Sequence, residues 1–203
     1  MYKVYGDIMS GNCYKIKLLM HFLNIPHQWI HVDILAGETR AETFRDMNPN
    51  MKVPVLDLDD GRYLSESNAV LNFLAQGTVF LPDEAFDRAR VLQWQFFEQY
   101  SHEPYIATAR FINKFLGLPK EKEKEYYGKQ EGGYKALSIM ERQLQNTRYL
   151  TGTAFTIADI SLFAYTHVAH EGGFNLEDYP HIRRWINDIV SLPKFISMAP
   201  ENA

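Results

Sequence analysis

The sequence of 203 residues has a single cysteine, Cys13, which excludes an internal disulfide and a cysteine-rich metal site. It has no window of about 20 apolar residues, the length that a membrane-spanning helix needs. No basic run accompanies its aromatic residues, and the net charge of −4 would repel nucleic acid and anionic membranes. The histidine pairs His27/His31 and His167/His170 also lack carboxylates at metal-ligand spacing. Together these absences predict a protein that binds no metal, no nucleic acid and no membrane.

What the sequence does contain is typical of a globular protein, with 46% hydrophobic and 23% charged residues. Its length suits one large domain or two small ones. Met1–Tyr5 carries no basic segment leading into an apolar stretch, so we expect no secretory signal. We therefore expect a cytoplasmic protein.

Strand and helix patterns alternate in the first part of the chain. Apolar residues at helical spacing follow the first β-prone run, and Asp59-Asp60-Gly61 is a hairpin turn signal. Thr39 and Glu42 have the spacing of a capping box for a short helix. The predicted order is βαβαββα, with strands at 2–5, 27–33, 53–58 and 62–64 and helices after 11, after 39 and at 69–74.

The strand signals stop after Gly77, and only helical patterns follow. Thr156 and Asp159 form the strongest helix-start signal there, a second capping box. We predict two domains, 1–76 and an all-helical 84–203, joined by a linker at 77–83. The helical stripes are Ala85, Ala89, Leu92 and Phe96; Leu137, Met140 and Leu144; and Ile182, Trp185, Ile186 and Ile189.

Three short motifs stand at turns between the predicted elements of the first domain: Ser10–Cys13, Val53-Pro54 and Glu66–Ala69. Strand ends are where sheets flanked by helices collect their ligand contacts. The first motif can hold a thiol, the second a peptide backbone and the third an amino-acid head group. A tripeptide with a central cysteine, glutathione, would use all three.

The order and spacing of these motifs, with the helical half that follows them, resemble the glutathione transferase superfamily over nearly the whole chain. The run Phe155–Ile160 is similar to the capping segment of the helical domain in that family. The resemblance implies a thioredoxin-like glutathione-binding domain and an all-α helical bundle forming a pocket for a small hydrophobic electrophile. It also implies a detoxifying homodimer and a cis peptide bond at Val53-Pro54, where the sequence alone favours trans.

The resemblance assigns the catalytic role to Ser10, whose hydroxyl would donate a hydrogen bond to the glutathione thiolate. Asn12 is the alternative donor, since its amide can also donate to sulfur and some relatives use an asparagine there. Taken alone, Ser10 would be a helix N-cap and Cys13 a small core residue. Ser10-x-x-Cys13 also resembles a thioredoxin Cys-x-x-Cys that has lost its exposed sulfur, which excludes dithiol chemistry within the chain.

The other two motifs would hold the rest of glutathione. With the Val53-Pro54 peptide bond in the cis form, the backbone of Val53 would pair with the cysteinyl residue of glutathione as a one-residue strand. The Ser67 hydroxyl and nearby backbone N–H groups suit the γ-glutamyl carboxylate, and Glu66 suits its ammonium. Acidic and hydroxyl residues at that position could also be plain helix capping.

Charge type and position suggest Lys52 for the glycine carboxylate of glutathione, with Arg40 as a second candidate. The first helix of the second domain should supply the electrophile site, through Tyr105 and Phe111. These two aromatic residues could equally be core. The same helix also carries Tyr100, His102 and Arg110.

Three functions are compatible with this pattern. The first is a glutathione transferase, in which the thiolate attacks an electrophilic carbon. The second is a glutathione-dependent disulfide or peroxide reductase, in which Asn12 and not Ser10 orients the sulfur. The third is a transferase fold retained as a non-enzymatic binding module, which the fold alone does not exclude.

Overall fold

The computed structural model describes residues 1–198, and its contacts divide the chain into two compact units. The first contains Met1–Gln76 together with the segment that starts at Pro193, and the second is Gly77–Leu192. This last segment was predicted to belong to the helical domain, 84–203. It belongs to the first unit because the buried Tyr14 hydroxyl donates a hydrogen bond of 2.6 Å to the carbonyl of Ile196.

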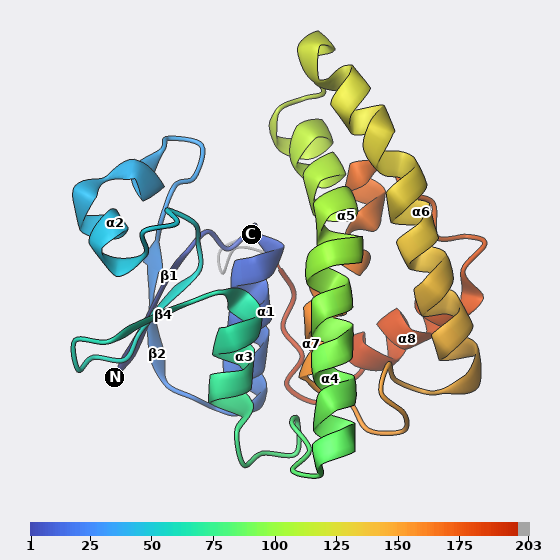
Figure 1. The fold of residues 1–203 in the computed structure, drawn as a ribbon, viewed down its shortest axis with the longest axis horizontal. Coiled ribbons are helices and arrows are strands. Elements are labelled where there is room, and N and C mark those ends of the chain that lie inside the picture. The colour runs from blue at the N-terminus through green and yellow to red at the C-terminus, as the bar shows by residue number, and fades with distance from the viewer. Residues whose placement is uncertain (199–203) are drawn as a thin grey trace. The chain divides into compact units, whose positions relative to one another are not determined.

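The first unit has the predicted βαβαββα order and a four-stranded mixed sheet. Its α1 and α3 lie side by side on one face of the sheet, and α2 lies on the other (Figure 1). The elements are β1 (Tyr2–Gly6), α1 (Gly11–Phe22), β2 (His27–His31), α2 (Glu42–Met47), β3 (Val55–Asp57), β4 (Tyr63–Ser65) and α3 (Ser67–Ala75).

The sheet has the strand order β2-β1-β3-β4. β1 runs parallel to β2 and antiparallel to β3, which is antiparallel to β4. Tyr5 near the end of β1 is paired with Val55 at the start of β3, and Val55 is paired with Ser65 at the end of β4. The end of β1, the start of β3 and the end of β4 therefore lie at the same edge of the sheet.

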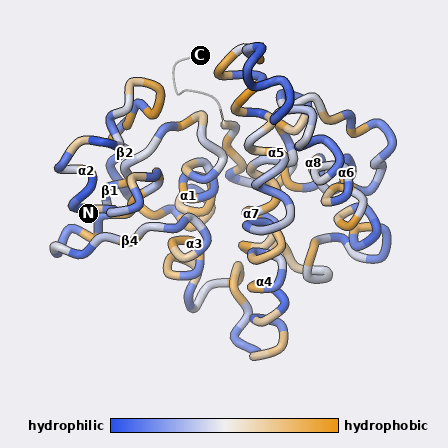
Figure 2. The backbone as a smooth tube through the Cα atoms, turned by 45° about the horizontal axis from the view of Figure 1, so that its top comes forward, coloured by the Kyte–Doolittle hydropathy of each residue, from blue (hydrophilic) through white to orange (hydrophobic). Residues whose placement is uncertain are grey.

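α1 is held to the sheet by an almost wholly apolar face. Cys13, Ile16 and Leu19 are fully buried, and hydrophobic segments run along α1 and α3 (Figure 2). A Cβ added at Gly6 would lie only 2.7 Å from Sγ of Cys13. The absence of a side chain at Gly6 lets the helix approach β1 closely at the turn where the site begins.

The predicted capping box of Thr39 and Glu42 is wrong. Thr39 lies inside a short 3₁₀ turn, Glu38–Arg40, and Glu42 is the first residue of α2. The N-cap of α2 is Ala41, which has no side chain that could accept a hydrogen bond from the helix. The 3₁₀ turn contains Thr39, the residue that the capping box would need as N-cap, so α2 begins two residues later than the pattern indicates.

The regular elements of the second unit are all helices within its described residues, apart from an isolated bridge between Tyr149 and Gly152. Its centre is α7 (Ile157–Thr166), in which every residue is buried. The predicted capping box is confirmed at its start: Thr156 accepts from the backbone of α7, and Asp159 Oδ2 accepts from the Thr156 N–H at 2.9 Å. The other long elements are α4 (Ala85–Phe97), α5 (Glu103–Arg110), α6 (Glu123–Asn146) and α8 (Pro180–Val190).

The predicted helical stripes differ in burial. Leu137, Met140 and Leu144 of α6 are buried, as are Ile182, Trp185 and Ile189 of α8. The stripe of α4 instead faces outward within its unit: Leu92 is 37% exposed and Phe96 60%, while Val91 and Trp94 provide the buried side. Within residues 1–198, no helix is long and apolar enough to span a membrane.

Candidate functional site

The three motifs occupy adjacent positions at one edge of the sheet. The first follows β1, the second precedes β3 and the third follows β4, and these are neighbouring strands. Neighbouring strands are about 4.8 Å apart, so three strand ends span about 10 Å. An extended tripeptide spans about the same length, at roughly 3.3–3.6 Å per residue. This edge can therefore hold an extended tripeptide, with a side-chain thiol at the first turn, the peptide backbone at the second and the amino-acid head group at the third.

Ser10 begins the first turn. It is the N-cap of α1 with an extended backbone (φ −75°, ψ 125°), but its hydroxyl makes no capping hydrogen bond to the helix. Burial raises the pKa of the Cys13 thiol to about 12, although a hydrogen bond with the Ser10 side chain acts to lower it. Cys13 consequently remains a protonated core thiol at neutral pH and does not serve as a nucleophile.

Asn12 is linked to the third turn by a buried lysine that the sequence analysis did not single out. Lys15 Nζ donates to Asn12 Oδ1 at 2.8 Å and to Ser67 Oγ at 3.3 Å. The Ser67 hydroxyl in turn donates to Asn12 Oδ1 at 3.1 Å. These contacts bring the Asn12 and Ser67 turns together, as the site prediction requires.

The position of Lys15 in the sequence did contain a signal. It lies four residues before Leu19 and three before Leu18, so helical spacing places this lysine on a buried face of α1. A charge within an apolar face needs partners. The sequence could not show that one partner comes from α3.

The cis peptide bond between Val53 and Pro54, implied by the family resemblance, is present. The side chain of Val53 packs against Val32, Phe44 and Val55. Within the described chain, the structure assigns no backbone hydrogen bond to Val53. Its N–H and C=O are therefore suited to pair with another extended chain.

Asn48, which the sequence analysis also missed, organises the loop before this proline. Its side-chain amide donates to the Lys52 carbonyl at 2.7 Å, and its Oδ1 accepts from the N–H of Asn50 at 3.1 Å. The side chain of Lys52 is exposed. It can reach solvent-side groups of a ligand while its backbone is held in place.

Glu66 is the N-cap of α3 and has an unusual backbone, with φ 66° and ψ 107°. Non-glycine residues with positive φ are uncommon and often occur at functional sites. The conformation sets Ser67 at the start of a nine-residue helix, where the first N–H groups have no partner within the helix. Because the Ser67 hydroxyl hydrogen is already donated to Asn12, these backbone groups are the donors available to a carboxylate.

Arg40 lies exposed in the 3₁₀ turn Glu38–Arg40, and the structure assigns its side chain no hydrogen bond or ion pair within residues 1–198. Its predicted role, like that of Lys52, stays a prediction.

The two residues predicted to contact an electrophile lie in the helical unit. The ring of Tyr105 packs so closely on α6 that a Cβ at Gly132 would lie 2.2 Å from it. Phe111 is 40% exposed and stacks on Phe115 at a centroid distance of 6.0 Å. His102 and Arg110 of the same segment are buried. Phe111 thus offers accessible aromatic surface, whereas Tyr105 is partly used in packing against Gly132.

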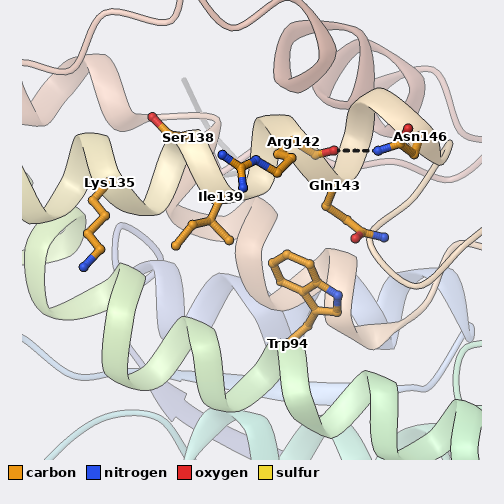
Figure 3. Close-up of a pocket in the computed structure, with 7 residues that line it drawn as sticks. All are labelled: Trp94, Lys135, Ser138, Ile139, Arg142, Gln143 and Asn146. Carbon is orange, nitrogen blue, oxygen red and sulfur yellow. Dashed lines mark hydrogen bonds between the residues drawn. The ribbon is translucent and has the colours of Figure 1, made fainter.

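An open groove of about 540 Å³ also lies in the helical unit, between α4 and α6 (Figure 3). Trp94 of α4 and Ile139 of α6 contribute its apolar surface, and Lys135 and Arg142 contribute positive charge. Tyr105 and Phe111 are not among its lining residues. This groove is separate from the residues predicted to contact an electrophile.

Among residues 1–198 there is no cluster of three or more His, Cys, Asp or Glu side chains that could hold a metal ion. The expectation that the protein works without a metal stays an expectation.

A thioredoxin-like sheet with these three turns, followed by an all-helical unit, defines a two-domain protein with a thioredoxin-like first domain. Residues 9–76 match the model of the glutathione S-transferase N-terminal domain, and residues 93–193 match that of the C-terminal domain. The chain therefore belongs to the glutathione S-transferase superfamily, a family of enzymes.

Individual relatives agree with this assignment. The crystal structure of a glutathione S-transferase from Pseudomonas fluorescens Pf-5 is 58% identical, with a TM-score of 0.97, and the match covers 98% of this chain and 99% of that one. Glutathione S-transferase F13 of Arabidopsis thaliana is 29% identical over 98% of this chain and 94% of its own. The disulfide-bond oxidoreductase YfcG of Escherichia coli K12 is 28% identical over 91% and 88%.

Proposed function

We propose that this enzyme binds glutathione along the sheet edge, ionises its thiol and conjugates it to a small hydrophobic electrophile. The observation that carries the proposal is the alignment of the three turns on adjacent strand ends, over the length of a tripeptide. The cysteinyl residue lies at Val53 with its sulfur toward Ser10 and Asn12. The γ-glutamyl group lies at Glu66 and the first N–H groups of α3.

The chemistry requires thiolate, since the neutral thiol is a poor nucleophile. A glutathione thiol with a pKa of about 8.5, like that of cysteine, is mostly protonated at pH 7. Lowering this pKa by two units takes about 2.7 kcal/mol of preferential thiolate stabilisation. Hydrogen bonds to a charged group contribute roughly 1.5–3 kcal/mol each, so the Ser10 hydroxyl and the Asn12 amide suffice together.

The reaction balances without further groups. The thiol proton leaves to solvent, the sulfur forms a bond to the electrophilic carbon, and a leaving group such as chloride departs with the electron pair of its bond. The protein contributes by ionising one reactant and positioning both. Phe111, and Tyr105 to the extent that its ring is accessible, would contact the electrophile, and Lys52 and Arg40 would contact the glycine carboxylate of glutathione.

The test is an ultraviolet titration of the thiolate of bound glutathione in the wild type, Ser10→Ala and Asn12→Ala. We expect a wild-type pKa well below the free value and an increase in the variant that lacks the dominant donor. Tight binding with an unshifted pKa would contradict an ionising site, and absence of glutathione binding would leave no support for the proposal. Turnover of a chloronitroarene measures the conjugation step itself.

A second candidate is glutathione-dependent reduction of disulfides or peroxides. It is favoured by the held side chain of Asn12 and by the similarity to a relative named a disulfide-bond oxidoreductase. Faster turnover of a small disulfide than of a chloronitroarene, with Asn12→Ala more damaging than Ser10→Ala, would select this function. Activity with neither substrate, despite glutathione binding, would indicate a binding module.

The family resemblance also leads us to propose a homodimer with a role in detoxification. The exposed apolar side chains of α4, among them Phe96 and Leu92, support association through that helix. A single cysteine is consistent with a reducing, cytoplasmic location. Light scattering at micromolar concentration, with Phe96→Glu as the disrupting variant, tests the dimer.

A further inference from the structure

Lys15 places a charged side chain in the protein interior, where loss of hydration destabilises a charge. Its side chain is fully buried in α1, at 0% exposure, whereas Lys17 two residues later is only partly buried. Burying an ammonium group costs several kcal/mol unless other groups compensate for the lost water. A hydrophobic residue would fill the same space at lower cost, so the ammonium group itself needs an explanation.

The partners of Lys15 supply one. An ammonium group can only donate hydrogen bonds, and Lys15 donates to Asn12 Oδ1. The Ser67 hydroxyl donates to the same oxygen. The amide oxygen of Asn12 therefore receives two donors, one of them charged. Reversing the amide would place its NH₂ group against an ammonium and a hydroxyl donor, so this orientation is fixed by chemistry.

We propose that Lys15 is a positioning residue that fixes the Asn12 amide with its NH₂ group directed to the glutathione sulfur. The inference rests on the proposed function and deepens it, because it makes Asn12 a committed donor to the thiolate. In either amide orientation the side chain has the same shape, but only the NH₂ end stabilises a thiolate. Without the lysine, the carbonyl end could face the sulfur and repel its negative charge.

The same lysine contacts both of the turns that would hold the sulfur and the γ-glutamyl group of glutathione. Its second hydrogen bond goes to Ser67, which begins the helix whose N–H groups face the γ-glutamyl carboxylate. The turn that holds the head group and the turn that holds the sulfur therefore share one cation. This arrangement keeps the two ends of the tripeptide site in a constant relation.

The first experiment compares Lys15→Met with Lys15→Arg and the wild type. Methionine keeps the length of the chain without a donor, and replacement of a buried ion by an apolar residue commonly leaves folding intact. We expect Lys15→Met to raise the pKa of the bound thiol by about one unit, since one hydrogen bond to a charged group is worth about this much. At pH 6.5, a rise from about 6.5 to about 7.5 lowers the thiolate fraction, and with it kcat, roughly fivefold. Lys15→Arg should restore part of both effects, and Lys17→Met on the same helix should change neither.

A double-variant comparison separates positioning from general structural support. In an Asn12→Ala background, Lys15→Met should have no further effect on the thiol pKa, because its target is gone. Equal effects in the two backgrounds would overturn the proposal. A thiol pKa in Lys15→Met equal to that of the wild type would also overturn it.

A readout independent of activity observes the amide directly. The side-chain NH₂ signal of Asn12 is assigned by its loss in Asn12→Ala, in ¹⁵N-labelled protein. It should shift when glutathione is added to the wild type and should not shift in Lys15→Met. If the Asn12 signal does not shift with glutathione in the wild type, or shifts equally in Lys15→Met, the proposal is overturned even where Lys15→Met raises the thiol pKa. Glutathione binding with no lowering of the wild-type thiol pKa counts instead against the proposed function.

Discussion

A buried ion pair in the helical unit allows a sharp test of how its helices are held together. Arg110 Nε lies 2.5 Å from Glu171 Oε2, and the two side chains are only 3% and 19% exposed. Lys114 bonds the other oxygen of the same carboxylate, and Asn113 donates to the Glu171 carbonyl at 2.8 Å. Glu171 thus connects the end of α5 and the π-helical segment Phe111–Phe115 that follows it to the short 3₁₀ segment Ala169–Gly172.

The perturbation is Glu171→Gln, which removes the charge and keeps the shape. Breaking a buried pair by removing one partner costs about 3–5 kcal/mol. Arg110 has further interactions and Glu171 is partly exposed, so we expect the lower end, a loss of about 3 kcal/mol. Lys114, with a side chain 32% exposed, should contribute less than about 1 kcal/mol when changed to Met.

The assay is urea denaturation of the purified variants at pH 7.5, arranged as a double-mutant cycle. Arg110→Met combined with Glu171→Gln should cost at least about 2 kcal/mol less than the sum of the single changes, because neither charge is then left alone. Additive losses would refute the reasoning, as would a Lys114→Met variant that loses as much as Glu171→Gln.

The pH dependence gives an independent check. Burial acts to raise the pKa of Glu171, but the hydrogen bonds from Lys114 and Arg110 outweigh it and hold this pKa below its usual value. The folded state then binds the proton more weakly than the unfolded state does. The ion pair's contribution should be complete above the unfolded pKa of about 4.3, decline as the pH falls through the folded pKa, and be missing from Glu171→Gln.

Three further predictions concern other buried groups. Burial lowers the pKa of His167 to about 4, so stability should fall by up to about 3 kcal/mol as the pH drops from about 6.5 to 4, and His167→Gln should flatten this part of the pH–stability curve. Asp159→Asn should lower the free energy of unfolding, measured by urea denaturation, by about 4 kcal/mol. Each carboxylate oxygen of Asp159 accepts from two donors, and the new NH₂ group can accept from none. A loss below about 1 kcal/mol would contradict this explanation. Gly6→Ala should cost about 2 kcal/mol through its clash with the Cys13 sulfur, and Cys13→Ala in the same chain should recover part of that loss.

Local patterns predicted the elements well where each element follows from its own residues. The alternation of the first unit, the capping box at Thr156 and Asp159, and the buried stripe of α8 are all local signals, and each is present. The predicted capping box of Thr39 and Glu42 is wrong because Thr39 lies within a 3₁₀ turn, and spacing alone cannot distinguish such a turn from an N-cap.

The turns of the candidate site could be predicted from the sequence, but the hydrogen bonds that link them could not. Ser10, Val53 and Glu66 are marked by their places between elements. Lys15 depends on α1 and α3 meeting through Asn12 and Ser67, which is a tertiary contact without a local signature. The backbone of Glu66 could not be foreseen either, because no residue type at that position demands a positive φ.

The hydrogen bond between Tyr14 and Ile196 connects residues 182 positions apart within one compact unit. During synthesis, residues 1–76 leave the ribosome long before Ile196 exists, and the whole helical unit emerges in between. The buried Tyr14 hydroxyl, one helical position from Lys15, lacks this acceptor until then, at a cost of about 1–3 kcal/mol. The first unit is thus begun first and completed last, and its final consolidation follows the synthesis of the helical unit.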